Sequence, residues 1–202
     1  NVSYALTLAD LYYKRYSISK DENDFRKGVD IAIEALSFPD SLDVKGPRAR
    51  ISFINRYSLH TFLANCFIEK AVALTSGDAE KAKWLQKAEQ EVHELSQLLG
   101  SAENPYMIMW RGRLLLAEGK LSEAVVQMNV AYDALTAGTA GEQPQVDMQL
   151  GRLSCDLAKV FENTPEVGAV LKYYSTALRS GLYLVKPEIL LDFAAVLTRV
   201  QD

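Results

Sequence analysis

Apolar residues recur every three or four positions along almost the whole chain, and this helical period constrains the fold more than any other feature. From Arg48 to Ser76, which reads as one long helix, a row of residues at this spacing is flanked by further apolar residues on the other sides. The row consists of Phe53, Tyr57, His60, Ala64, Phe67, Ala71 and Leu74. A helix that is apolar around most of its circumference is packed by several neighbours. No segment shows a convincing two-residue period of a strand, so the sequence predicts an all-α fold.

Turn residues divide this pattern into about nine helices. Gly100 and Gly119 stand where a helix should end. We expect Asn23 or Asp24 to cap the second helix, and a later helix to begin at Pro165 after a Thr164 cap. Because the connections are short, consecutive helices should be antiparallel neighbours. The predicted hairpins span residues 2–38, 48–99, 105–136 and 145–180, with an extra C-terminal helix at 187–201.

Small residues stand at regular places between Tyr106 and Leu135. Gly112 lies midway along the first helix of this pair, and Ala124 and Ala131 lie seven residues apart on the second. Two helix axes approach to roughly 8–9 Å only where side chains are small. With the turn at Gly119-Lys120, this segment resembles one tetratricopeptide (TPR) repeat.

The resemblance extends along the chain with an uneven period. Residues 2–38 and 145–180 match the pattern more loosely, whereas the pair from Arg48 to Leu99 has longer helices and a blurred small-residue spacing. The period is roughly 40–55 residues, against about 34 in regular TPR proteins. The resemblance implies one domain over residues 1–202, built as an α-α superhelix, or solenoid, of antiparallel hairpins. An irregular helical bundle is the alternative.

In TPR proteins the first helix of each hairpin lines a concave face that binds another protein, and the resemblance implies the same use here. The mixture of aromatic, apolar and basic residues on that face suits a peptide with acidic and apolar residues. The Lys/Asn/Asn pattern of the subfamily that binds chaperone tails is not reproduced, so that partner is not predicted. The residues expected to line the face are Asp10, Tyr13, Lys14, Tyr106, Met109, Arg113, Leu116, Arg152, Cys155, Lys159 and Glu162.

The last predicted helix has an apolar stripe and no helix after it. Because exposed ends of helical arrays need polar caps, we expect the chain either to continue in its natural protein or to pair here with a second copy. Three classes of function stay open: an interaction scaffold, a structural module that self-associates, and a regulatory domain with a closed ligand pocket or an unrecognised enzyme. We expect the first of these.

Composition narrows the class of protein. Apolar residues make up 49% and charged residues 24%, as in a folded domain rather than a disordered chain. The net charge of -4 and the absence of a long basic run argue against a nucleic-acid partner. No apolar run is long enough to predict a membrane span. We expect a cytoplasmic protein, and the first residue, Asn1 rather than Met, suggests a processed chain or a piece of a longer one.

No motif predicts catalysis, a cofactor or a metal. His60 lies on an apolar helix face and is expected to be buried or half-buried. His93 has Glu89 one turn before it, but a metal site needs three or four converging ligands. The glycine-rich phosphate-binding motifs are absent. Cys66 and Cys155 are too isolated to indicate a disulfide framework, so two reduced thiols are expected.

Overall fold

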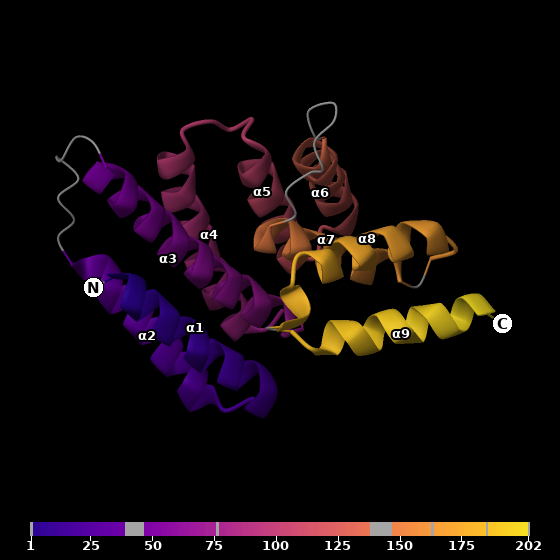
Figure 1. Ribbon diagram of the computed structural model, residues 1–202, viewed down its shortest axis with the longest axis horizontal. Helices are drawn as coiled ribbons and strands as arrows, with labels where there is room; N and C mark the ends of the chain where they lie inside the picture. Colours follow the sequence, from indigo (N-terminus) through magenta and orange to yellow (C-terminus); the bar gives the residue numbers. More distant parts are fainter. Residues whose placement is uncertain are drawn as a thin grey trace. The chain divides into compact units, whose positions relative to one another are not determined.

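The computed structural model describes residues 2–38, 47–75, 77–137, 147–162, 164–184 and 186–201, without the side chains of 47–52, 200 and 201. In these ranges the regular structure consists of nine α-helices and one short 3-10 helix, with no strand, which confirms the all-α prediction (Figure 1). The chain packs as two compact units, Asn1–Ala102 and Glu103–Asp202. Most of the two predicted loops, 40–47 and 136–144, lies outside the described residues.

Unit 1 consists of two helix hairpins. The first pairs α1 (Val2–Ser19) with α2 (Glu22–Ser37), and the second pairs α3 (Pro47–Val72) with α4 (Ala79–Leu99). The long α3 also packs on α1 and α2, which explains why apolar residues occur on several of its sides. His60, on α3, is buried as expected, and its Nδ1 lies 2.7 Å from Glu91 Oε2 on α4.

The start of α2 differs from the prediction. The N-cap is Asp21, whose Oδ1 accepts a hydrogen bond of 2.9 Å from the Asn23 backbone N–H. Asp24, one of the two residues predicted to cap the helix, is buried and lies 3.1 Å from Arg15 Nε on α1. Several side chains in this polar tract could accept the capping hydrogen bond. Asp24 is paired with Arg15 of α1, and Asp21 is the residue that caps α2.

Unit 2 contains two hairpins and a final helix. The hairpins are α5 (Pro105–Glu118) with α6 (Leu121–Thr136), and α7 (Met148–Phe161) with α8 (Val167–Arg179). The 3-10 helix η1 (Leu182–Leu184) leads into α9 (Glu188–Gln201), which packs on α8. Further contacts join α5 to α7 and α6 to α7. Both helices of the α5–α6 hairpin therefore pack on each other and on α7 of the next hairpin, consistent with the predicted stacking of helix pairs.

In each unit a helix ends at the glycine that the sequence predicts to end it. Gly100 and Gly119 adopt positive φ angles of 70° and 87° and end α4 and α5. The prediction for α8 is wrong by two residues, because the helix begins at Val167 rather than Pro165, with Glu166 in the N-cap position. The Thr164 hydroxyl instead donates a hydrogen bond of 2.8 Å to the Phe161 carbonyl, closing the end of α7.

The small residues of the α5–α6 pair lie inside the structure. Gly112, Ala124 and Ala131 are all buried, as expected for small residues at a helix crossing. A Cβ atom added at Gly112 would lie 2.6 Å from Met128 Cγ and 3.1 Å from the Met128 backbone nitrogen. The crossing of α5 and α6 therefore has no room for a side chain at this position.

The second helices of the two hairpins in unit 2 are joined by polar contacts. The Tyr173 hydroxyl on α8 donates to Asn129 Oδ1 on α6 at 2.7 Å. One turn along, the Tyr132 and Thr176 hydroxyls lie 3.0 Å apart, and the rings of Tyr132 and Tyr173 meet edge to face. We refer to these contacts as the tyrosine links.

Candidate functional site

The predicted binding residues of unit 2 lie on or at the end of α5 and α7, the first helices of its two hairpins, and polar side chains join α5 to α7 and α7 to α9. The Tyr106 hydroxyl on α5 donates to Asp147 Oδ2 at 2.6 Å, and Asp147 is also the N-cap of α7. Further along, Arg113 Nε donates to Asp156 Oδ2 at 2.6 Å. The charges of this surface are therefore used to join neighbouring helices.

The same pattern continues from α7 to α9. Lys159 Nζ lies 3.6 Å from Asp192 Oδ2, and Arg199 Nη2 lies 3.4 Å from Glu162 Oε1. Arg199 Nη1 also donates to the Glu162 carbonyl at 3.2 Å. Together with the two α5–α7 contacts, these pairs form what we call the polar row. A ligand bound here would compete with pairs that the chain already makes.

The charge state of Lys159 agrees with this pairing. Partial burial lowers the pKa of its ammonium group, but the neighbouring Cys155, Asp192, Asp156 and Glu188 raise it, and the net pKa is above the ordinary value. Lys159 is therefore charged across the neutral range, and its contribution to stability is lost only as the pH rises through that raised pKa.

The structure divides the predicted concave-face residues into two groups. Buried side chains, which offer no surface to a partner, are those of Tyr13, Met109, Arg113 and Cys155. At least partly exposed are Asp10, Lys14, Tyr106, Leu116, Arg152, Lys159 and Glu162. A helix that packs on both its hairpin partner and the next hairpin exposes a narrower strip of its surface than a helix with a single neighbour does.

The predicted residues of α1 belong to unit 1. Asp10 and Lys14 pair with each other along the helix at 2.8 Å. The Tyr13 hydroxyl donates to Glu69 on α3, and its ring meets those of Tyr16, Phe25 and Phe62. Tyr13 is thus a core residue of unit 1, in line with the usual role of tyrosine between packed helices.

The outer face of α9 is an exposed apolar surface on unit 2. Ile189 and Val196 are buried, and the opposite side of the helix is exposed. Leu191 is 74% exposed, and Leu184, in the adjoining 3-10 helix, is 72% exposed. The outer face consists of Leu190, Leu191, Ala194, Ala195, Leu197 and Thr198. The sequence-predicted apolar stripe is thus divided between a buried and an exposed side.

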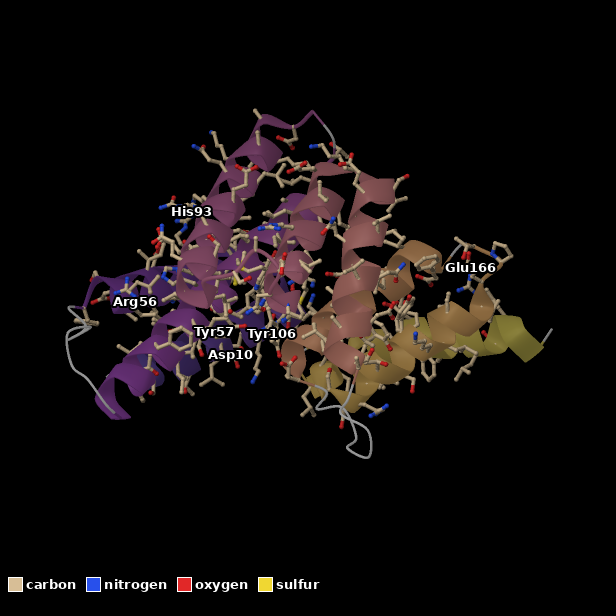
Figure 2. The ribbon with its side chains drawn as sticks, turned by 90° about the horizontal axis from the view of Figure 1, so that it is seen from above. Asp10, Arg56, Tyr57, His93, Tyr106 and Glu166 are labelled. Atoms are coloured by element: carbon tan, nitrogen blue, oxygen red, sulfur yellow. The ribbon has the colours of Figure 1, made fainter. Side chains whose placement is uncertain are left out.

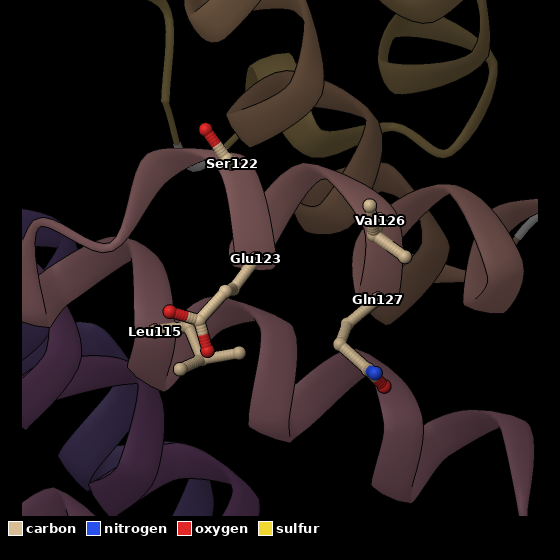
Figure 3. Close-up of a pocket in the computed structure, with 5 residues that line it drawn as sticks. All are labelled: Leu115, Ser122, Glu123, Val126 and Gln127. Carbon is tan, nitrogen blue, oxygen red and sulfur yellow. The ribbon is translucent and has the colours of Figure 1, made fainter.

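A shallow depression lies between α5 and α6 (Figure 3). Its volume is about 350 Å³, and it is lined by Leu115, Ser122, Glu123, Val126 and Gln127. Two aliphatic side chains here stand beside one carboxylate and one amide. The depression is open to solvent and is not an enclosed ligand pocket.

Histidine and cysteine side chains do not form a reactive cluster in the described part of the chain. His93 lies at the surface of α4, with its Nε2 3.0 Å from Gln97 Nε2 (Figure 2). Burial, aided by the charge of Asp156, raises the pKa of the Cys155 thiol to about 11, so the thiol is protonated at neutral pH and unreactive. Among the residues that the structure describes, no group of three or more His, Cys, Asp or Glu side chains could hold a metal ion.

Comparison with protein-family models, with curated proteins and with solved structures gives no match to this chain. The resemblance to TPR repeats therefore stays a prediction, based on helix pairing and small-residue spacing. Within the described ranges, every helix is too short or too polar to cross a lipid bilayer.

Proposed function

We propose that the chain is a protein-binding scaffold that takes a helix of a partner protein on the outer face of α9. This face carries the proposal because all but one of its six exposed residues are apolar. Contiguous apolar surface on a folded domain marks an interaction site more often than single exposed residues do. A partner helix on this face would pack on α9 as α9 packs on α8, and would so continue the stack of helices in unit 2.

The free energy gained by burying the apolar side chains of this face suits a reversible complex. Leu190, Leu191 and Leu197 are each between about two-fifths and three-quarters exposed. Covering what remains exposed of these three side chains would contribute on the order of a few kcal/mol, and Ala194 and Ala195 allow the partner backbone to approach closely. The polar row beside the face supplies charged groups at its edge, which favour partner selection and orientation over affinity.

The choice of α9 over the predicted concave face follows from how each surface is already used. On α5 and α7, Arg113, Lys159 and Glu162 are paired with carboxylates or a guanidinium of neighbouring helices. A peptide bound there must break such pairs and compensate for them. The outer face of α9 carries no such pairs, so its apolar area is available at no comparable cost.

Affinity capture with the intact chain tests the proposal. Leu191→Glu places a charge on the outer face of α9, and Leu121→Glu makes the same change at an exposed position on α6. Both positions are at the surface, so both variants should keep the wild-type circular dichroism spectrum. We expect Leu191→Glu to lose the captured proteins and Leu121→Glu to retain them. Equal capture by both variants would reject the proposal, and so would a wild type that captures neither another protein nor a second copy of the chain.

A further inference from the structure

We propose that the outer face of α9 is filled by α9 of a second copy of this chain, in an antiparallel pair related by a two-fold axis. The inference rests on the proposed function of this face as a helix-binding surface, and it names the partner. Three properties of α9 lead to it: the position of its small residues, the placement of its leucines, and the signs of the charges at its two ends.

The small residues lie at the middle of the helix. Along Glu188–Gln201 the exposed ridge follows the order Leu191, Ala194, Thr198, at helical spacings of three and four. If the two-fold axis passes beside Ala194, this alanine meets Ala194 of the second copy. The two backbones can then approach to about 8 Å, the short end of the range for packed helices.

The same two-fold axis places Leu191 and Leu197 of the two copies opposite each other. A two-fold axis at Ala194 places Leu191 opposite Leu197 of the second copy, and Leu197 opposite the second copy's Leu191. Large side chains therefore lie on both sides of the small centre and contact each other across the pair. A two-fold interface requires such self-complementarity, because one surface must serve as both partners.

The charges select the antiparallel direction. Glu188 stands in the first turn of α9 and Arg199 in its last. An antiparallel pair brings Glu188 close to Arg199 of the second copy, twice over, whereas a parallel pair brings like charges together. Arg199 is paired with Glu162, yet its side chain remains 51% exposed, so it can reach a second carboxylate at the edge of the interface.

The exposed apolar residues of α1 are a weaker candidate for the surface that covers α9. Tyr4, Leu11 and Ile18 are exposed at seven-residue intervals along α1. Thr7 and Arg15, also exposed, lie between them on the same side of the helix, so the apolar side chains are isolated from one another. Packing of α1 on α9 of another copy would also place two different surfaces against each other, without the self-complementarity that the pair of α9 helices has.

Sedimentation equilibrium of the intact chain, from about 1 to 100 μM, tests the assembly state. We expect a dimer with twice the chain mass of 22.5 kDa. Leu191→Glu should be monomeric over this range, and Leu121→Glu should dimerise like the wild type. A wild-type monomer at every concentration would overturn the inference and leave binding of a different protein on α9 open to the capture experiment. A concentration-dependent series of larger species would overturn it as well.

Disulfide cross-linking tests the direction and register of the pair. In the antiparallel arrangement the cysteine introduced by Ala194→Cys lies opposite the same position of the second copy. The cysteine introduced by Thr198→Cys lies opposite Leu190 of the second copy. On mild oxidation with copper phenanthroline, Ala194→Cys should form a covalent dimer and Thr198→Cys should not. Both native cysteines are buried and serve as an internal blank in the wild type. Cross-linking at both introduced positions would indicate a parallel pair, and cross-linking at neither would exclude α9 as the interface.

Discussion

Arg113 and Asp156 join α5 to α7 through a hydrogen bond of 2.6 Å between groups in very different surroundings. The arginine side chain is 1% exposed, whereas that of Asp156 is 24% exposed. The guanidinium group also lies 5.3 Å from the centre of the Trp110 ring. The pair therefore consists of a cation that cannot reach water and an anion that can.

This asymmetry predicts unequal effects of removing either partner. Asp156→Ala removes a carboxylate from beside a buried charge and should lower the free energy of unfolding by about 3–5 kcal/mol. Arg113→Met keeps an apolar stem of similar length and leaves a carboxylate that water can solvate, so it should cost less, about 1–3 kcal/mol. Urea unfolding followed by circular dichroism measures both. Equal losses would show that Asp156 does not compensate the buried charge.

Three glycines test the close approach of helices in unit 2. A Cβ atom at Gly112 would lie 2.6 Å from Met128 Cγ, and one at Gly151 would lie 2.5 Å from Ser180 Cβ. Replacing either residue with alanine should destabilise the chain by about 1–3 kcal/mol, because the helices must move apart. Gly168, on α8, has no atom within 4 Å of an added Cβ and is the matched control.

Gly168→Ala should raise the stability by about 0.5–1 kcal/mol through helix propensity alone. Thermal unfolding of the three variants side by side ranks them directly. If Gly112→Ala and Gly168→Ala had the same melting temperature, the close crossing of α5 and α6 would be refuted.

The stability of the chain should fall at alkaline pH partly because of Cys155. Its pKa is raised by burial from 9.0 to about 11 in the folded state. Below about pH 9 the thiol is protonated in both states, and between about pH 9 and 11 only the unfolded state has lost this proton, so rising pH favours unfolding. The loss should reach at most about 3 kcal/mol.

Cys155→Ala removes this contribution without removing the other titrating groups. Urea unfolding at about pH 8 and pH 10.5 should therefore show a smaller pH-dependent loss in the variant than in the wild type. The comparison uses the difference between the two pH values, so the cost of the substitution itself cancels. Identical losses in the two proteins would mean that the folded thiol titrates normally.

Lys70 is held in unit 1 between aromatic rings. Its Nζ lies 4.7 Å from the centre of the Tyr16 ring, 4.6 Å from that of Phe25 and 2.5 Å from Glu22 Oε1. Partial burial lowers the pKa of Lys70, but Glu22 and Tyr16 raise it and give a net upward shift. Lys70→Met should cost about 1–2 kcal/mol, and Lys70→Arg should recover most of that loss.

Lys14 provides the control for this prediction, since its side chain is more exposed and its pairing with Asp10 stays within α1. Lys14→Met should change the stability by about 0.5 kcal/mol or less. Chemical unfolding of the variants gives the comparison. A similar cost at positions 14 and 70 would show that the rings around Lys70 do not stabilise its charge.

The sequence predicts the helices well because their apolar period and their glycine ends are local properties. Gly119 ends α5 where expected, and Gly112 and Ala124 are buried at a helix crossing. The cap of α2 was harder to predict because Asp21, Asn23 and Asp24 all suit the position. Only the tertiary contact with Arg15 sets Asp24 apart from the other two.

The candidate site was less predictable for a related reason. Arg113 and Lys159 were correctly assigned to the first helices of their hairpins, but their partners Asp156 and Asp192 lie more than thirty residues further along the chain. A helical period shows which residues share a face and does not show which charges meet across two helices. A signal that was available is that Asp156 stands at the same place in α7 as Arg113 does in α5.

The two hairpins of unit 2 are tied along both of their edges. On one edge, Tyr106 and Arg113 reach the carboxylates of α7, and on the other the tyrosine links join α6 to α8. A hinge motion that opened either edge would break oriented polar contacts there, so neither edge can serve as a soft pivot. Mechanical load entering through α9 would consequently pass into α7 and α8 and be borne by both hairpins as a single stiff body.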